Sequence, residues 1–443
     1  MKNRSVHTSA VVFATLAMML ILTLILASSA SAQTEKVLFN FNANSTKDGA
    51  NPYLYGALVM DSAGNLYGTA ANGGKTHGIA FKLTPTTKGQ WKEQVMHNFA
   101  GYDTADPSKS DGDFPYAALI EDASGNFYGV ADEGGTLNYG NVYKLSPTAS
   151  GGWKETILYN FTNGNDGGYP GYPLVMDSSG NLYGVAEGGN GANCDNGCGV
   201  LFELSPTTKG PWKETTVHIF QGTAPGTCPP QPGDVDDGSD PVGPLYIDSS
   251  GNMFGATALG GCNNEDAINS GTVYELTPNG SGGWNYGQIL ALPSPNGGSN
   301  PSGSVVEDSS GNLYGMYSAG EGGVWTCLAS ACSSTYYLVD AFSCPPAGCG
   351  GLPASTRGGG LILDSLGNLY GTSYNGGNVY GTVFELSPGQ TWTEETLWSF
   401  TETDGANPYC TLIRDSEGNF YGSTAYGGVS SGTGSGVIFE VTP

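Results

Sequence analysis

The amino-acid sequence predicts an all-β fold: a seven-bladed β-propeller of four-stranded blades, whose ring is closed by the N-terminal strand pairing with the last blade. Three observations lead to this prediction. One phrase recurs seven times, each repeat holds four strand-like runs, and the two chain ends carry complementary parts of one repeat. Self-similarity at a period of roughly sixty residues is typical of blades or coils.

The recurring phrase consists of an Asp, two variable residues, Gly-Asn, an apolar residue, an aromatic residue and Gly. The Asp carboxylate is able to accept the backbone N–H two residues on, and the Gly tolerates the positive φ of a tight turn. The phrase therefore predicts a hairpin between the first two strands of each repeat. Its copies begin at Asp61, Asp122, Asp177, Asp248, Asp308, Asp364 and Asp415.

The third repeat illustrates the four runs of each unit. Short stretches rich in Val, Thr, Leu and aromatic residues, separated by Gly, Pro and Asp, are typical of strands joined by turns. Seven such units favour radial repetition around an axis. In this repeat the runs cover residues 173–176, 181–186, 199–204 and 212–220.

The chain ends carry the evidence for a closed ring. Residues 37–41 resemble the fourth strand of other repeats, such as residues 157–161, whereas residues 437–443 match a third strand. The last repeat thus lacks its fourth strand, and the N-terminus supplies a spare one. Pairing the two covers a sheet edge that would otherwise be bare. A linear solenoid would instead need capping units.

The phrase, followed by a Gly-Gly loop and a third strand such as Gly-Thr-Val-Phe-Glu-Leu-Ser-Pro at residues 381–388, resembles the GloVer tandem-repeat family of exported bacterial proteins. The resemblance covers essentially all of the chain after its first 32 residues. It implies an exported repeat protein, and it implies no particular chemistry.

Residues 1–32 are predicted to be a cleaved signal peptide. Lys2 and Arg4 precede an apolar run over residues 11–27, and Ala30-Ser31-Ala32 offers the small-x-small pattern of a cleavage site. A retained transmembrane anchor is the alternative. On the first interpretation, residues 33–443 form a single propeller, exported to the periplasm or the extracellular space.

The composition excludes several classes of partner. The chain holds 15 basic and 40 acidic residues, a net charge of −25. Nucleic acid and anionic membranes are bound through Lys and Arg, so neither is expected as a partner. The charge either attracts cations or simply keeps an exported protein soluble. We expect a monomer, with no membrane span in the mature chain.

Nine cysteines in an exported chain predict disulfides. Cys410 is left over, at a position where other repeats mostly carry small residues. It is interpreted as a small buried side chain, with a catalytic thiol as the alternative. A cysteine zinc site is disfavoured by oxidising export. The proposed pairs are Cys194–Cys198, Cys228–Cys262, Cys327–Cys332 and Cys344–Cys349.

The loops after the second and fourth strands are expected to share one face of the ring. Their lengths vary, as residues 68–78 and 255–271 illustrate, whereas the turns of the other face are nearly constant. Variable loops on a rigid scaffold indicate a binding face. Aromatic side chains there would stack on sugar or peptide, or serve only as loop anchors. They are Tyr102, Phe114, Tyr139, Tyr169, Trp325, Tyr374 and Tyr426.

Three further features of the sequence bear on ligand or metal chemistry. Arg357 stands where other repeats place Pro; it would attract a carboxylate, or it is a plain surface substitution. His97 and His218 occupy a slot that other repeats fill with aromatic residues, which favours packing over catalysis. An acidic loop would offer carboxylates to calcium, or is merely solvated. Its members are Asp234, Asp236, Asp237 and Asp240.

No motif for nucleophilic catalysis, zinc hydrolysis or phosphate binding is present, and no cofactor is predicted. The leading hypothesis is a non-catalytic module that binds a glycan or a surface protein through its variable loops. A carbohydrate-active lyase or hydrolase at the channel mouth, and a structural envelope module, are the alternatives. Two carboxylates, or an acid with a Tyr or His, converging at the channel mouth would favour the enzyme.

Overall fold

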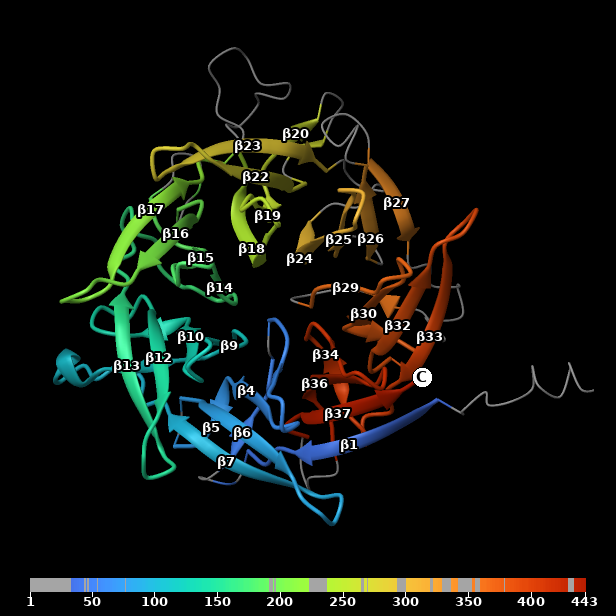
Figure 1. The fold of residues 1–443 in the computed structure, drawn as a ribbon, viewed down its shortest axis with the longest axis horizontal. Helices are drawn as coiled ribbons and strands as arrows, with labels where there is room; N and C mark the ends of the chain where they lie inside the picture. Colours follow the sequence, from blue (N-terminus) through green and yellow to red (C-terminus); the bar gives the residue numbers. More distant parts are fainter. Residues whose placement is uncertain are drawn as a thin grey trace, which may run out of the picture.

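The computed structural model describes residues 33–43, 45, 48–53, 55–75, 77–190, 194, 197–222, 237–263, 267–268, 270–292, 300–318, 322–328, 336–341, 353–354, 359–377, 379–428 and 434–443. Within them, seven antiparallel sheets of four or five strands stand around a central axis (Figure 1). Each sheet is one blade, and its strands, a to d in chain order, run from the axis outward. The predicted seven-bladed propeller is confirmed.

The first three blades follow the repeats closely. Blade 1 comprises β3 (Val59–Met60), β4 (Leu66–Ala70), β6 (Ile79–Pro85) and β7 (Trp91–Asn98). Blade 2 comprises β9 (Ile120–Glu121), β10 (Phe127–Ala131), β12 (Asn141–Pro147) and β13 (Trp153–Asn160). Blade 3 comprises β14 (Val175–Met176), β15 (Leu182–Ala186), β16 (Val200–Ser205) and β17 (Lys213–Ile219).

The next three blades repeat the same order. Blade 4 comprises β18 (Ser239–Ile247), β19 (Met253–Leu259), β22 (Thr272–Pro278) and β23 (Trp284–Ala291). Blade 5 comprises β24 (Pro301–Glu307), β25 (Leu313–Tyr317), β26 (Gly323–Cys327) and β27 (Tyr336–Ala341). Blade 6 comprises β29 (Ile362–Leu363), β30 (Leu369–Ser373), β32 (Thr382–Ser387) and β33 (Thr393–Ser399).

Short paired strands lie in the loops that follow strands b and d, on the side of the ring that we call the loop face. The two-stranded pairs are β2 (Gly49–Ala50) with β5 (Asn72–Gly73), β8 (Gly112–Asp113) with β11 (Glu133–Gly134), β20 (Cys262–Asn263) with β21 (Ala267–Ile268), and β28 (Pro353–Ala354) with β31 (Asn375–Gly376). One turn of 3₁₀-helix, η1 (Pro107–Lys109), lies in the loop that enters blade 2. No helix in the described part of the chain is long and apolar enough to cross a membrane.

Blade 7 joins the two ends of the chain. It comprises β34 (Ala406–Pro408), β35 (Ile413–Arg414), β36 (Phe420–Tyr426), β37 (Val437–Thr442) and the N-terminal β1 (Thr34–Asn40). β1 pairs antiparallel with β37, from Thr34 opposite Thr442 to Asn40 opposite Val437, and the two lie side by side in Figure 1. This pairing confirms the predicted closure of the ring.

The recurring phrase forms the predicted hairpin, and its polar atoms are used within the turn. In blade 1 the Asp61 carboxylate accepts hydrogen bonds from the backbone N–H of Ala63 and Asn65, from the Asn65 side chain and from the Tyr67 hydroxyl, at 2.7–3.0 Å. Burial would raise the pKa of Asp61, but these hydrogen bonds hold it below its ordinary value. The constant phrase therefore has a structural role.

The last residue of the phrase makes room for an aromatic side chain of strand c. A Cβ at Gly68 would lie 2.8 Å from Phe81, and one at Gly315 would lie 2.4 Å from Trp325. This contact corrects one prediction: Trp325 is not a loop aromatic but the strand-c aromatic of β26, and it is 1 % exposed. It was misassigned because the fifth repeat departs from the common third-strand sequence.

Adjacent blades are joined by a Gly–Pro contact at the loop face. Gly436, at φ 90°, opens strand c of blade 7, and a Cβ there would lie 2.6 Å from Cδ of Pro52 in blade 1. The Asn51 N–H donates to the Ser435 carbonyl at 2.7 Å. The same contact recurs at Gly78–Pro115, Gly140–Pro170, Gly199–Pro241, Gly271–Pro301 and Gly381–Pro408. It sets where each strand a begins beside the channel.

The cysteine predictions are tested in part. Cys194 and Cys198 form the predicted disulfide, and Cys327 is disulfide-bonded as well. Cys410 is a free thiol with no exposed surface, as predicted, and burial raises its pKa to about 11. The other proposed partners, Cys228, Cys332, Cys344 and Cys349, lie outside the described residues, and so do the side-chain contacts of Cys262.

Candidate functional site

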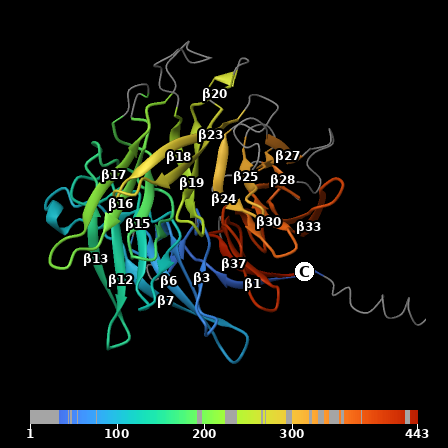
Figure 2. The same cartoon turned by 45° about the horizontal axis from the view of Figure 1, so that its top comes forward.

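The channel mouth on the loop face is lined by aromatic residues that follow the interblade prolines. Tyr53, Tyr116 and Tyr409 come directly after Pro52, Pro115 and Pro408. Because each proline packs against the preceding blade, the next residue is held at the rim of the channel. The hairpin turns β6–β7 and β12–β13 extend from the opposite rim (Figure 2).

These tyrosines form a continuous cluster across the channel mouth. Tyr55 lies near its centre, with ring centroids 5.5–5.8 Å from Tyr116, Tyr172 and Tyr409. The Tyr53 and Tyr426 hydroxyls are 2.6 Å apart. Edge-to-face and tilted contacts of this kind stabilise aromatic clusters. The members of the cluster are Tyr53, Tyr55, Phe114, Tyr116, Tyr172, Tyr374, Tyr409 and Tyr426.

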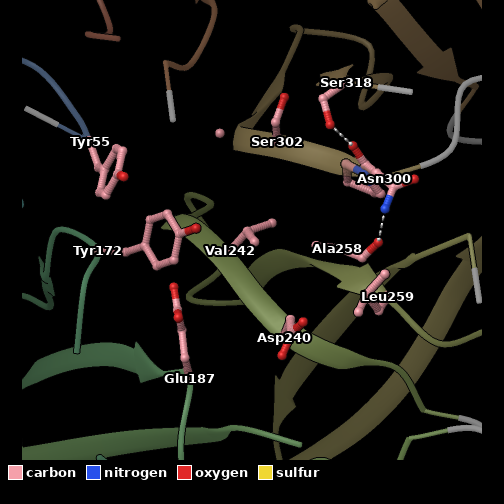
Figure 3. A pocket seen from close by; sticks show the side chains of 12 residues that line it. Tyr55, Tyr172, Glu187, Asp240, Val242, Ala258, Leu259, Asn300, Ser302 and Ser318 are labelled. Carbon is pink, nitrogen blue, oxygen red and sulfur yellow. Dashed lines mark hydrogen bonds between the residues drawn. The ribbon is translucent and has the colours of Figure 1, made fainter. Parts of the chain in front are cut away.

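A cavity of about 400 Å³ opens beside this cluster, between blades 3, 4 and 5 (Figure 3). The Tyr55 and Tyr172 rings border one side, and Glu187 points toward Tyr172. Across the cavity, the Asn300 side chain donates to the Ala258 carbonyl at 3.2 Å, and the backbone carbonyl of Asn300 accepts from the Ser318 hydroxyl. We call this cavity the channel-mouth pocket; its other lining residues are Asp240, Val242, Leu259, Pro301, Ser302 and Gly303.

Two carboxyl groups converge on the channel-mouth pocket. Glu187 follows β15, and Asp240 lies near the start of β18. Burial, together with the negative charge of Asp240, raises the pKa of Glu187 to about 7, and burial raises that of Asp240. Asp132, at the equivalent position of blade 2, has a pKa raised to about 7 by burial and by Glu187. One of these carboxyls is therefore able to hold a proton near neutral pH.

The described lining of the pocket contains no basic side chain, since none of its residues is Lys, Arg or His. Carboxylates in such a setting accept hydrogen bonds from hydroxyl or amino groups and repel anionic ones. The chemistry of the pocket thus suits a polyhydroxylated ligand that lacks carboxylate, phosphate or sulfate groups.

The predicted ligand residues divide among four places. Phe114, Tyr374 and Tyr426 belong to the aromatic cluster. Tyr139 and Tyr169 form an edge-to-face pair of their own, at 5.6 Å. Tyr102 lies in the loop entering blade 2, 37 % exposed. Trp325 is in the core, as described above, and Arg357 lies outside the described residues.

The acidic loop, for which calcium binding and plain solvation were the two interpretations, is described at two of its members. The Asp237 carboxylate accepts from His218 Nε2 and from the Gln221 N–H, each at 2.8 Å. Asp240 instead lines the channel-mouth pocket. The two carboxylates lie in different places because Asp237 precedes β18, which begins at Ser239, whereas Asp240 is part of that strand. Asp234 and Asp236 lie outside the described residues.

His97 and His218 lie in packed positions, as their slot in the repeat predicts. His218 stacks on Tyr286 with centroids 4.0 Å apart, and His97 meets Phe99 edge to face. In addition, Nε2 of His97 contacts Asp111, and Nε2 of His218 contacts Asp237. The sequence predicted the packing of both rings but not these polar contacts.

Sequence reasoning did not single out Tyr53, Tyr55, Tyr116, Tyr172, Tyr409 and Glu187. Local signals exist for all of them except Tyr55. A Pro-Tyr dipeptide recurs at the start of three repeats, and Tyr172 stands where most repeats carry a small residue. Glu187 stands three residues after the phrase, at a position that is small in Ala71, Ala258, Ser318 and Ala425 but acidic or large in Asp132 and Tyr374. A large or acidic side chain at a small position beside the axis marks a site in this architecture.

Comparison with known proteins agrees with the fold. Residues 26–234 match the family model of the Gloeobacter/Verrucomicrobia repeat, which confirms the resemblance over that stretch. No curated protein matches the sequence. Among solved structures, the chain is similar to a family PL25 ulvan lyase bound to -[GlcA(1-4)Rha3S]-, with 12 % identity over 91 % of this chain and 95 % of that chain and a TM-score of 0.52.

A second structure of similar shape is a putative 6-phosphogluconolactonase from Bacteroides uniformis. It shows 14 % identity over 81 % of this chain and 88 % of that chain, with a TM-score of 0.48. At such identities the likeness concerns the propeller architecture, because one fold hosts many unrelated functions.

Proposed function

From a seven-bladed propeller that carries the Gloeobacter/Verrucomicrobia repeat, we propose that this chain binds a glycan in the channel-mouth pocket. One observation carries the proposal: tyrosine rings, carboxylates and an amide converge on a cavity of about 400 Å³. This volume falls in the range of small-molecule pockets, about 300–1,000 Å³. Rings offer stacking surface to the apolar face of a sugar, and carboxylates accept from its hydroxyl groups.

The charge of the pocket supports a neutral or amino-bearing sugar. Glu187 and Asp240 line it, and the lining includes no basic side chain. An acidic sugar such as the glucuronate named in the ulvan lyase structure would meet repulsion here. We further propose an exported, monomeric protein; the Cys194–Cys198 disulfide supports an oxidising compartment.

The test of this proposal is calorimetric titration of the mature protein with matched neutral, amino-bearing and uronate oligosaccharides. We expect binding of a neutral or amino-bearing member. Tyr55→Ala and Glu187→Gln should weaken that binding by about 1–3 kcal/mol, as truncation of central contacts does. Leu366→Ala is the matched control, because Leu366 lies in the β29–β30 turn, outside the pocket, and is 79 % exposed. Melting temperatures of all variants verify that the ring remains folded.

Two results would contradict the proposal. One is binding to uronates alone, since the electrostatic argument would then have the wrong sign. The other is the absence of glycan binding while an envelope protein binds and Tyr55→Ala leaves its affinity unchanged. The loop face would in that case be a protein-binding surface outside the pocket.

Hydrolysis of a glycosidic bond is a second candidate, favoured by the two carboxyls at one pocket. Glu187, with a pKa of about 7, has the protonation state of a general acid near neutral pH, and Asp240 would act as the second carboxylate. We expect release of reducing ends from a bound neutral glycan. Glu187→Gln should lower the rate at saturating substrate about 10²–10⁴-fold, a loss separate from its effect on affinity. Binding without any cleavage would leave the site a binding module.

A further inference from the structure

A recurring arrangement of three side chains lies at the outer part of the blade interfaces. The first side chain comes from strand d of one blade. The second is the Asp of an Asp-Gly pair in the loop that leads to the next blade. The third lies on strand d of that next blade, two residues after a position at or just before the start of the strand where most blades have Trp. At the described interfaces these triplets are Phe39, Asp48 and Glu93; His97, Asp111 and Glu155; Tyr159, Asp166 and Glu214; His218, Asp237 and Tyr286; and Trp398, Asp404 and Glu35.

The interface of blades 1 and 2 brings three metal-ligating side chains together. His97 lies on β7, Asp111 in the following loop and Glu155 on β13. Their potential ligand atoms all lie within 4.8 Å of one another. Among the described residues, these three are the ones that the structure brings together as a possible metal-binding group. At the other described interfaces a triplet position holds Phe, Tyr or Trp.

The spacing of the three side chains suits one ion. His97 Nε2 lies 2.8 Å from Asp111 Oδ2 and 3.6 Å from Glu155 Oε2. In a tetrahedral zinc site with bonds of about 2.0–2.1 Å, the ligand atoms are about 3.3–3.4 Å apart. The observed distances bracket that value, so small side-chain shifts are enough to place an ion between them.

The group is also incomplete without a further partner. Glu155 Oε1 is buried and accepts no hydrogen bond, as is also true of Oε1 of Glu35 and Glu93, so the imidazole of His97 is what distinguishes this interface. The carboxyl groups of Asp111 and Glu155 face one imidazole and are hydrogen-bonded to each other, which requires a proton on one of them. Lys75, which also acts on His97, is exposed. Buried charges in proteins are generally paired or coordinate a metal. A divalent cation would replace the proton between the two carboxyl groups and would also use the unpartnered oxygen.

We propose that His97, Asp111 and Glu155 bind one Zn²⁺ ion, which joins strand β7 of blade 1 to strand β13 of blade 2. Imidazole nitrogen and carboxylate oxygens are ligands that zinc accepts, and water completes the coordination in sites with three protein ligands. The His97 side chain is 21 % exposed, which leaves a side open to water and to entry of the ion. The site is distinct from the channel-mouth pocket, with which it shares no residue.

The experiment is a zinc titration of the mature protein, with tags removed and metal stripped by a chelator. Calorimetry and the metal content after dialysis give affinity and stoichiometry. The chain offers its own matched variants: His97→Phe reproduces the Phe39 triplet, and His218→Phe makes the same change at the interface where Tyr286 fills the third position. Asp111→Asn serves as a second variant should His97→Phe fail to fold.

We expect one zinc ion in the wild type and in His218→Phe, together with a higher melting temperature when zinc is present, because the ion binds the folded state. His97→Phe and Asp111→Asn should lower zinc affinity at least 100-fold and lose the thermal shift. Unchanged zinc binding in both variants would overturn the proposal. So would calcium binding as tight as zinc, because a calcium site would not require the imidazole.

Discussion

A chain that begins at Asn42 should fail to form a stable ring. It lacks β1, whose residues Thr34–Asn40 pair with β37, and it lacks Phe41, which has no exposed surface. Leu38 is nearly buried as well. Burial of each large apolar side chain contributes about 1.5–3 kcal/mol. The summed loss approaches the 5–15 kcal/mol that separates a typical folded protein from its unfolded state.

The measurement compares the melting temperature and aggregation of this truncation with those of a chain that begins at Gln33. A synthetic peptide of residues 34–41, added in excess, should restore part of the lost melting temperature, because it supplies the missing edge strand. Equal melting of the two chains would show that β1 does not hold the ring closed.

The protein should be more stable in mild acid than in mild base. Burial, with a contribution from Asp404, raises the pKa of Glu35 to about 8, and burial, with Asp48, does the same for Glu93. In the unfolded chain these groups ionise near pH 4.5. Between these pH values the folded state holds more protons. Stability is therefore full below the unfolded pKa and is lost as the pH rises through about 8.

After discounting for the solvent-exposed part of each site, we expect a loss of about 1–2 kcal/mol per interface between pH 5 and pH 8.5. Thermal melts across this range check the sign. The double variant Glu35→Gln and Glu93→Gln should make the profile less steep, since an amide keeps the shape of a protonated carboxyl, while Asp132 and Glu187 retain part of the slope. A profile as steep in the double variant as in the wild type would assign the pH dependence to other groups.

The repeat alone determined the architecture. The Asp-x-x-Gly-Asn hairpins, the four runs of each unit and the half-repeat offset of the ends are local in sequence, and each has one physical solution, a turn or a covered sheet edge. The Cys194–Cys198 disulfide and the buried Cys410 were also predictable from local sequence. Cys194 and Cys198 are only four residues apart, and Cys410 occupies a position at which most other repeats carry a small residue.

The sites depended on contacts between blades, which a single repeat does not reveal. Tyr55, Tyr172, Glu187 and Asp240 come from three different repeats, and the Gly–Pro contacts bring them to one rim. Trp325 shows the converse, because an aromatic in a degenerate repeat was placed in a loop although packing against Gly315 buries it. Local pattern decides which strands form, whereas the closed ring alone decides which side chains from distant repeats meet.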